Sequence, residues 1–221
     1  DQEVDDPLSE IQRLHETQNC AVLSDLPVFH GGWVGYFSYD VVRYIEPRLA
    51  ESAPADPLDV PDILLLLVTE VVVFDNLRGT LTLVVNADTS IDNAYPAACD
   101  RLASLTEILG ATSPDLPALS LDGLEYDTEV VHGTSQEDFE CHVCRIKDYI
   151  LAGDVMQVVI SHRMTRDFNA PPINLYRALR YLNPSPYLYF LNFDDFQVVG
   201  SSPEILVRVS GGRVTVRPIA G

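Results

Sequence analysis

The sequence predicts an α+β fold, with antiparallel sheets at the core and helices packed outside them. Two glycine-containing turns, at 76–79 and 211–212, each separate β-rich segments and therefore predict hairpins. A capped apolar stripe that begins at Ser135 predicts a long helix. With 221 residues, of which 47% are hydrophobic, the chain has the length and composition for a sizeable buried core.

The first half combines one cap signal with several β-rich runs. Asp6 and Pro7 stand in the order of helix cap and first-turn proline. Farther on, glycines with alternating aromatic residues predict a strand that other backbone approaches closely. In chain order we expect a helix to about Gln18, a strand at 31–40, a surface loop at 46–61, strands near 63–75 and 80–87, and a helix near 91–109 that ends at Gly110.

The second half opens with the clearest helix of the chain. Ser135, with Asp138 three positions later, resembles a capping box, and Gly153 is typical of a helix end. Prolines bound the next helix on both sides. We expect a helix between Ser135 and Gly153, a strand at 155–163, a helix from Pro171 to Leu182, and strands near 187–193, 196–200, 204–209 and 213–219.

Charge and hydropathy exclude two classes of partner. The net charge is −19, with a single lysine, Lys147, and such a surface repels the phosphates of nucleic acids. The apolar run at 63–68 is far shorter than the roughly 20 residues that a membrane span requires. We therefore expect neither nucleic-acid binding nor membrane insertion.

The cysteines and histidines show no metal-site pattern. Cys141 and Cys144 have the spacing of half a zinc site, but no second pair follows at a suitable distance. Both fall on the predicted helix, where thiols pack as small apolar groups. The five histidines are scattered through the sequence. We expect reduced cysteines in a cytoplasmic protein, and no metal ligand in this chain.

An ordered series of short motifs runs along the chain. The motifs are GGWVGY at 31–36, DVVRYIE at 40–46, the hairpin at 71–87, GDVMQVVIS at 153–161, NPSPYL at 183–188, GSSPE at 200–204 and PIAG at 218–221. In this order the series resembles a known family, the large subunits of anthranilate synthase, which use chorismate. Each motif alone is weak, whereas the whole series in the family order is strong.

The resemblance also implies an architecture. It implies a β-sandwich core, with the remainder of an N-terminal domain at 1–115, a linker at 116–134 and the first part of a chorismate-binding domain at 135–221. In the family, the PIAG motif continues into Thr-Arg-Pro-Arg-Gly and a long catalytic half. We therefore expect the C-terminal part of the enzyme to be missing from this sequence.

The reaction that the resemblance implies requires a general acid. Ammonia adds to the chorismate ring, the 4-hydroxyl leaves, and the side chain is lost as pyruvate, which gives anthranilate for tryptophan biosynthesis. A hydroxyl leaves poorly unless it is protonated. Glu204 matches the family's catalytic glutamate, and its apolar neighbours Ile205 and Leu206 would favour the protonated carboxyl. The structural alternative is a strand-end glutamate that caps backbone groups or pairs with Arg208.

Three further positions bear on the substrate. Water-adding relatives carry a lysine base where this chain has Gln157, and an amide cannot remove a proton from water. Aminodeoxychorismate synthases carry a nucleophilic lysine where this chain has Ala220, and a methyl group forms no adduct. The resemblance also implies that the backbone amide of Gly221 meets a substrate carboxylate. Gln157 and Ala220 together favour ammonia as the nucleophile and anthranilate as the product.

Regulation and partners also follow from the resemblance. Pro186, Tyr187 and Leu188 match part of the pocket that binds tryptophan as feedback inhibitor, although a plain helix-to-strand turn remains the alternative. Mg²⁺ is the expected cofactor, with its ligands downstream of this chain. Ammonia is expected from a separate glutamine amidotransferase subunit. Two other functions stay open: an aminodeoxychorismate synthase large subunit of the folate pathway, and a non-catalytic tryptophan-binding or regulatory fragment.

Overall fold

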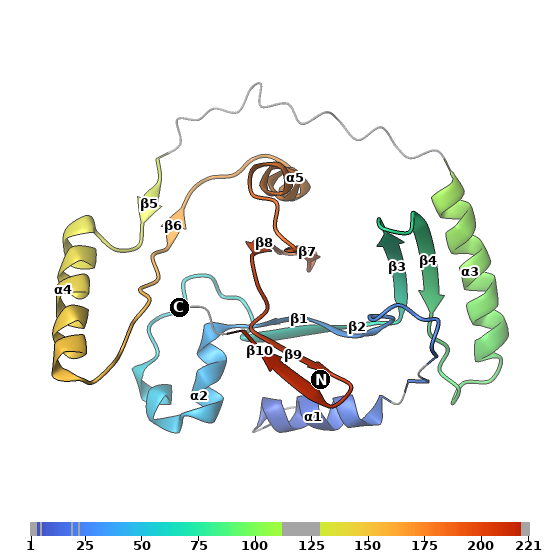
Figure 1. Cartoon of the computed structure of the whole chain (residues 1–221), viewed down its shortest axis with the longest axis horizontal. Coiled ribbons are helices and arrows are strands. Elements are labelled where there is room, and N and C mark those ends of the chain that lie inside the picture. Colours follow the sequence, from blue (N-terminus) through green and yellow to red (C-terminus); the bar gives the residue numbers. More distant parts are fainter. Residues whose placement is uncertain (1–3, 5, 19, 22, 112–128, 218–221) are drawn as a thin grey trace. The chain divides into compact units, whose positions relative to one another are not determined.

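The computed structural model describes residues 4, 6–18, 20–21, 23–111 and 129–217 (Figure 1). The chain forms two compact units, Asp1–Asp115 and Leu116–Gly221. Each sheet among the described residues consists of two antiparallel strands, and both units also contain helices. The predicted combination of helices with antiparallel sheets is therefore confirmed. In the described part of the chain, no helix has the length and apolar character to cross a bilayer.

The first helix, α1 (Pro7–Thr17), begins at the cap that the sequence predicts. The Asp6 carboxylate accepts hydrogen bonds from the backbone nitrogens of Leu8 at 3.0 Å and Ser9 at 3.3 Å. Free N–H groups of the first turn are thereby satisfied. The Ser9 hydroxyl donates to the same carboxylate, and this bond, with the backbone bonds, lowers the pKa of Asp6.

Strand β1 (Gly32–Phe37) pairs antiparallel with β2 (Ile63–Val68). A Cβ atom at Gly35 would collide with the backbone carbonyl oxygen of Leu64, which explains why a glycine stands inside this strand. Helix α1 and this sheet together enclose an apolar pocket of about 270 Å³. Its lining includes Val4, Pro7, Ile11, Leu14, Trp33, Ile63 and Leu65.

The single strand expected near 63–75 is wrong, because the structure divides it at Thr69. The second piece, β3 (Glu70–Asp75), pairs with β4 (Thr80–Val85) instead of β1. The carbonyl oxygen of Thr69 accepts hydrogen bonds from the backbone nitrogen of Asn86 at 2.8 Å and from its side-chain amide at 3.1 Å. These bonds satisfy the Thr69 carbonyl at the point where the chain passes from one sheet to the next.

Helix α3 (Ala94–Gly110) contacts β4. Arg101 on this helix donates two hydrogen bonds, at 2.8 and 2.9 Å, to the carboxylate of Glu70 on β3. The bond lowers the pKa of Glu70 and raises the pKa of Arg101. Three short helical segments lie between β1 and β2: η1 (Tyr39–Val41), α2 (Val42–Ile45) and η2 (Pro47–Ser52). The last of them makes the expected loop at 46–61 helical in part.

The second unit starts with a short strand pair and a long helix. β5 (Val131–His132) pairs with β6 (Met164–Thr165), and α4 (Gln136–Ala152) lies between these two strands in the sequence (Figure 1). The Ser135 hydroxyl accepts a hydrogen bond from the Asp138 backbone nitrogen at 3.1 Å and donates to its carboxylate at 2.7 Å. Gly153 follows the helix with a left-handed φ of 85°, so both predicted ends of this helix are confirmed.

The strand expected at 155–163 is wrong. The structure assigns no strand there, and β6 covers only the two residues that follow. A β-rich run becomes a strand only when another segment pairs with its backbone. Among the described residues, the partner β5 reaches only Met164 and Thr165.

Helix α5 (Pro172–Leu182) packs against a hairpin of β7 (Tyr187–Asn192) and β8 (Gln197–Ser202). Tyr176 on the helix meets Phe190 on β7 edge-to-face, with ring centroids 6.1 Å apart. A second hairpin joins β9 (Val207–Ser210) to β10 (Arg213–Val216). The predicted hairpin turn at 211–212 is thus confirmed, with both glycines at positive φ.

The buried core that length and composition led us to expect is not formed among the described residues. Within the described residues, only Val41 and Val84 are buried, each with 8% exposure. Large apolar side chains such as Leu77, Met156 and Leu206 are more than four-fifths exposed. The β-sandwich that the resemblance implied is likewise not described, because each sheet in the described part of the chain has two strands only.

Candidate functional site

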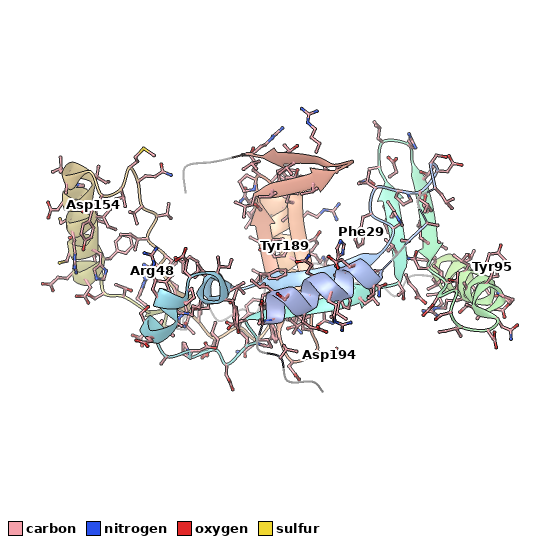
Figure 2. All side chains as sticks on the ribbon, turned by 90° about the horizontal axis from the view of Figure 1, so that it is seen from below. Phe29, Arg48, Tyr95, Asp154, Tyr189 and Asp194 are labelled. Atoms are coloured by element: carbon pink, nitrogen blue, oxygen red, sulfur yellow. The ribbon has the colours of Figure 1, made fainter. Side chains whose placement is uncertain are left out.

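The β7–β8 hairpin brings two of the sequence motifs to the same end of one sheet. Tyr187 lies opposite Ser202, and Leu188 lies opposite Ser201. The NPSPYL segment enters β7 at this end, and the GSSPE segment leaves β8 there. Figure 2 labels Tyr189, within β7, and Asp194, at the turn that joins β7 to β8. The pairing register therefore places Glu204 just beyond the end of the sheet at which the NPSPYL segment enters β7.

Serine hydroxyl groups tie these two motifs together. The Ser185 hydroxyl donates a hydrogen bond to the carbonyl oxygen of Ser202. The Ser201 hydroxyl donates to the carbonyl oxygen of Asn183 at 3.1 Å. Two bonds between the same two segments fix their separation more firmly than the sheet register alone. The turn before β7 and the turn after β8 thus form one hydrogen-bonded unit.

Glu204 is held at both its backbone and its side chain. The Ser202 hydroxyl donates to the backbone carbonyl oxygen of Glu204 at 3.0 Å. The Arg217 guanidinium lies 3.4 Å from the Glu204 carboxylate, whose side chain is 25% exposed. The carboxylate is therefore accessible and oriented, which a group that delivers a proton to a bound molecule requires.

The surroundings of Glu204 differ from the sequence analysis in two ways. The alternative of an ion pair with Arg208 is wrong, since the partner is Arg217, which follows the strand that the second hairpin returns beside Val207. The predicted apolar surround is incomplete, because Leu206 is 83% exposed. The register of the 211–212 turn was the signal that could have revealed Arg217, since it returns the chain toward residue 206.

The three residues expected at an inhibitor pocket do not share one face of β7. Tyr187 and Pro186 are exposed, whereas Leu188 is half-buried. Alternation along the strand puts Leu188 on the same side as Phe190, which packs on α5. The glycine at 200 leaves room for the ring of Tyr189, because a Cβ atom there would collide with that ring. Tyr187 and Tyr189 therefore line the face opposite α5.

Gln157 lies outside this hairpin, in the extended segment between α4 and β6, and its side chain is exposed. The residues that follow it line a pocket of about 400 Å³ against α4, together with His142, Arg145, Ile146 and Tyr149. Arg145 donates a hydrogen bond to the Tyr149 hydroxyl at 3.0 Å on the helix side of this pocket. Ala220 and Gly221 lie outside the described residues.

Metal-ligating side chains do not gather into a larger cluster in the described part of the chain. No group of three or more His, Cys, Asp or Glu side chains there could hold a metal ion. Cys141 and Cys144 are free and exposed, so the expectation that they pack as apolar groups is wrong. The structure does bring His132 and His162 together, with ring nitrogens 3.2 Å apart. Thirty positions separate them in the sequence, so no local spacing could reveal this pair.

Comparisons of this chain with a family model and with known proteins agree on one family. The family model for chorismate binding enzymes matches residues 1–221. Anthranilate synthase component 1 of Pseudomonas putida is 51% identical over 220 residues, which cover 99% of this chain and 45% of that protein. The corresponding protein of Aquifex aeolicus (strain VF5) is 42% identical, with 99% of this chain and 44% of that protein covered.

A solved structure shows the same similarity in three dimensions. The crystal structure of anthranilate synthase component I from Streptococcus pneumoniae TIGR4 superposes with a TM-score of 0.79 at 30% identity. The match covers 96% of this chain and 47% of that chain. The chain thus spans about half the length of the relatives that it matches.

Proposed function

The chain belongs to the family of chorismate binding enzymes, and from this premise we propose that it provides the N-terminal part of an anthranilate synthase large subunit. The complete enzyme would convert chorismate and ammonia to anthranilate and pyruvate, the first step of tryptophan biosynthesis. The observation that carries the proposal is the match along the whole chain to relatives named anthranilate synthase component 1, at up to 52% identity.

Glu204 is the proposed general acid. Loss of the 4-hydroxyl from the ring requires a proton on the leaving oxygen, and a carboxylic acid within hydrogen-bond reach supplies it. The contact with Arg217 orients the Glu204 carboxylate, and the Ser202 hydroxyl fixes the backbone that carries it. Because the side chain is partly exposed, a substrate can reach it without a change in the fold.

Ammonia is the proposed nucleophile. Gln157 offers no base for the activation of water, and Ala220 offers no amine for a covalent adduct. Ammonia needs neither, because the neutral amine is a much stronger nucleophile than neutral water and attacks without prior deprotonation. Glutamine amidotransferase is the proposed source of the ammonia, as the partner subunit of the complete enzyme. These two positions favour anthranilate over the product of an aminodeoxychorismate synthase.

Mg²⁺ belongs to the proposal as a cofactor of the complete enzyme. The described residues do not fit it, since they contain no group of three or more His, Cys, Asp or Glu side chains able to hold a metal. Its proposed ligands lie in the part of the relatives that this chain does not cover. No step that we assign to Glu204 depends on the ion.

Feedback control by tryptophan is the last part of the proposal. Pro186, just before β7, and Tyr187, on the exposed face of β7, would contact the inhibitor, and Leu188 would support them from the face that packs on α5. The serine bonds of this turn to β8 would hold it in shape. We further propose that the β-sandwich forms in an enzyme of full length, and that this enzyme works in the cytoplasm.

A chimeric enzyme tests the proposal. Residues 1–221 are continued by the C-terminal part of the Pseudomonas putida relative, which is 51% identical in the shared region. With chorismate, Mg²⁺ and ammonium at about pH 8.5, where more of the ammonia is unprotonated than at neutral pH, the chimera should form anthranilate, detected by fluorescence. The 221-residue chain alone should form none. A correctly folded chimera without activity, beside an active Pseudomonas putida enzyme, would refute the proposal.

A further inference from the structure

The short strand pair of β5 and β6 brings two histidines together. β5 and β6 share only two residue pairs, Val131 with Thr165 and His132 with Met164. The backbone nitrogen of Gly133 extends this pairing with a hydrogen bond of 2.8 Å to the carbonyl oxygen of Arg163. A Cβ atom at Gly133 would meet that carbonyl oxygen at 3.2 Å, so the two segments approach closely. His132 and His162 lie at the edge of this contact.

Two ring nitrogens converge at this edge. The Nδ1 atom of His132 lies 3.2 Å from the Nε2 atom of His162, with ring centroids 5.2 Å apart and planes inclined by 51°. Phe139 on α4 packs beside the His162 ring, at 5.9 Å between centroids, and limits its rotation. Both histidines are exposed, so ions from solvent can reach the nitrogens.

The separation of these nitrogens fits a shared metal ion. Imidazole nitrogens bind zinc at about 2.05 Å, so two of them on one tetrahedral ion lie about 3.3 Å apart. The observed 3.2 Å needs only a small adjustment of the rings to admit such an ion. The net charge of −19 also attracts cations to the surface of the chain.

We propose that His132 and His162 form a binding site for one divalent first-row transition metal ion, such as Zn²⁺, Ni²⁺ or Cu²⁺. Imidazole selects these ions over Mg²⁺, which prefers oxygen ligands. Water completes the coordination sphere, because no third His, Cys, Asp or Glu ligand joins the pair among the described residues. The bound ion links β5 to the segment just before β6 and so stabilises this strand pair. The site is independent of the chorismate reaction.

Calorimetric titration of the 221-residue chain with Ni²⁺ tests this site. The four exposed cysteines are alkylated first, because thiolates would compete for the ion. The wild-type chain should bind one Ni²⁺. His132→Gln and His162→Gln should each weaken binding by at least about tenfold, since the second ligand acts at high effective concentration. His142→Gln, which changes a histidine on α4, is the matched control and should bind as wild type.

Several outcomes would overturn the site. Absence of Ni²⁺ binding to the wild-type chain would leave a plain hydrogen bond between the histidines. If wild type, His132→Gln and His162→Gln bind Ni²⁺ with equal affinity, the ion binds elsewhere. A loss of Ni²⁺ binding in His142→Gln alone would lead to the same conclusion. Far-ultraviolet circular dichroism checks that each variant keeps its helices, and if one variant unfolds, the other decides.

Discussion

At the scale of single residues, Glu204 connects the local structure most directly to the proposed chemistry. Its backbone is fixed by Ser202 and its carboxylate by Arg217. Neither contact comes from the strand neighbours that the sequence suggested. The residues that surround a carboxylate in a turn depend on which segments the neighbouring hairpins bring close to it. The pairing register of those hairpins decides this.

Replacement of Glu204 separates its two roles. In the chimeric enzyme, Glu204→Gln keeps the shape but removes the transferable proton, so kcat should fall about 10²–10⁴-fold. KM for chorismate should change little, because the lost interaction belongs to the transition state. Steady-state fluorescence assays give both constants. Arg217→Gln is the control that removes the ion pair and keeps the acid. If the two variants lose activity equally, Glu204 acts through the ion pair and not as the acid.

The candidate site was only partly predictable at this scale. Glu204 and the NPSPYL segment were recognised from motifs, and the hairpin register brings both to one end of a sheet. The division of Tyr187 and Leu188 between two faces was missed, although the period of a strand dictates it. The pairing of His132 with His162 was beyond sequence reasoning, because it arises from contact between distant segments.

At the scale of secondary-structure elements, local signals predicted helices better than strands. The caps at Asp6 and Ser135 and the glycine at 153 mark helix ends through bonds within a few residues. Strands depend on distant partners instead. The run at 63–75 has uniform β propensity, yet it divides at Thr69 because its two parts pair with different strands.

Gly35 gives a test of the β1–β2 sheet. Gly35→Ala should lower the free energy of unfolding of the first unit by about 1–3 kcal/mol, because the added methyl group meets the Leu64 carbonyl oxygen. Urea denaturation followed by the fluorescence of Trp33 measures the change. Gly110→Ala, at the end of α3, is the matched control, because nothing lies within 4 Å of its added methyl group. A control that loses as much stability as Gly35→Ala would contradict the close approach.

The Glu70–Arg101 pair predicts how acid affects the β3–α3 contact. The hydrogen bond to Arg101 lowers the pKa of Glu70 from its ordinary value of 4.5 in the folded state. The stabilisation is therefore present above pH 4.5 and is lost as the pH falls through the lower folded pKa. Glu70→Gln should lower Tm near neutral pH and have no effect in strong acid.

Thermal unfolding by circular dichroism across this range checks the prediction. Glu107→Gln, which changes an exposed carboxylate on the same helix, is the matched control and should show no such dependence. A pH-independent difference between wild type and Glu70→Gln would mean that the ion pair contributes nothing. Because both partners are solvent-exposed, added salt should also reduce the effect.

At the scale of the whole molecule, exposed apolar surface is the main departure from the sequence expectation. Composition indicated a protein with a buried core, yet only Val41 and Val84 are buried among the described residues. The chain also spans about half the length of its relatives. The combination of helices with antiparallel hairpins was predictable from local patterns. The way in which sheets pack against other elements was not, because that packing depends on segments far apart in the sequence.

The identity of the product tests the central claim most directly. Gln157 and Ala220 both come from this chain in the chimeric enzyme, so the choice of nucleophile depends on its own residues. Chorismate, Mg²⁺ and isotopically labelled ammonium are supplied, and the products are separated by chromatography and identified by mass. We predict labelled anthranilate with an equal amount of pyruvate, and no isochorismate or salicylate. Labelled 4-amino-4-deoxychorismate as the main product would contradict the account and assign the chain to an aminodeoxychorismate synthase.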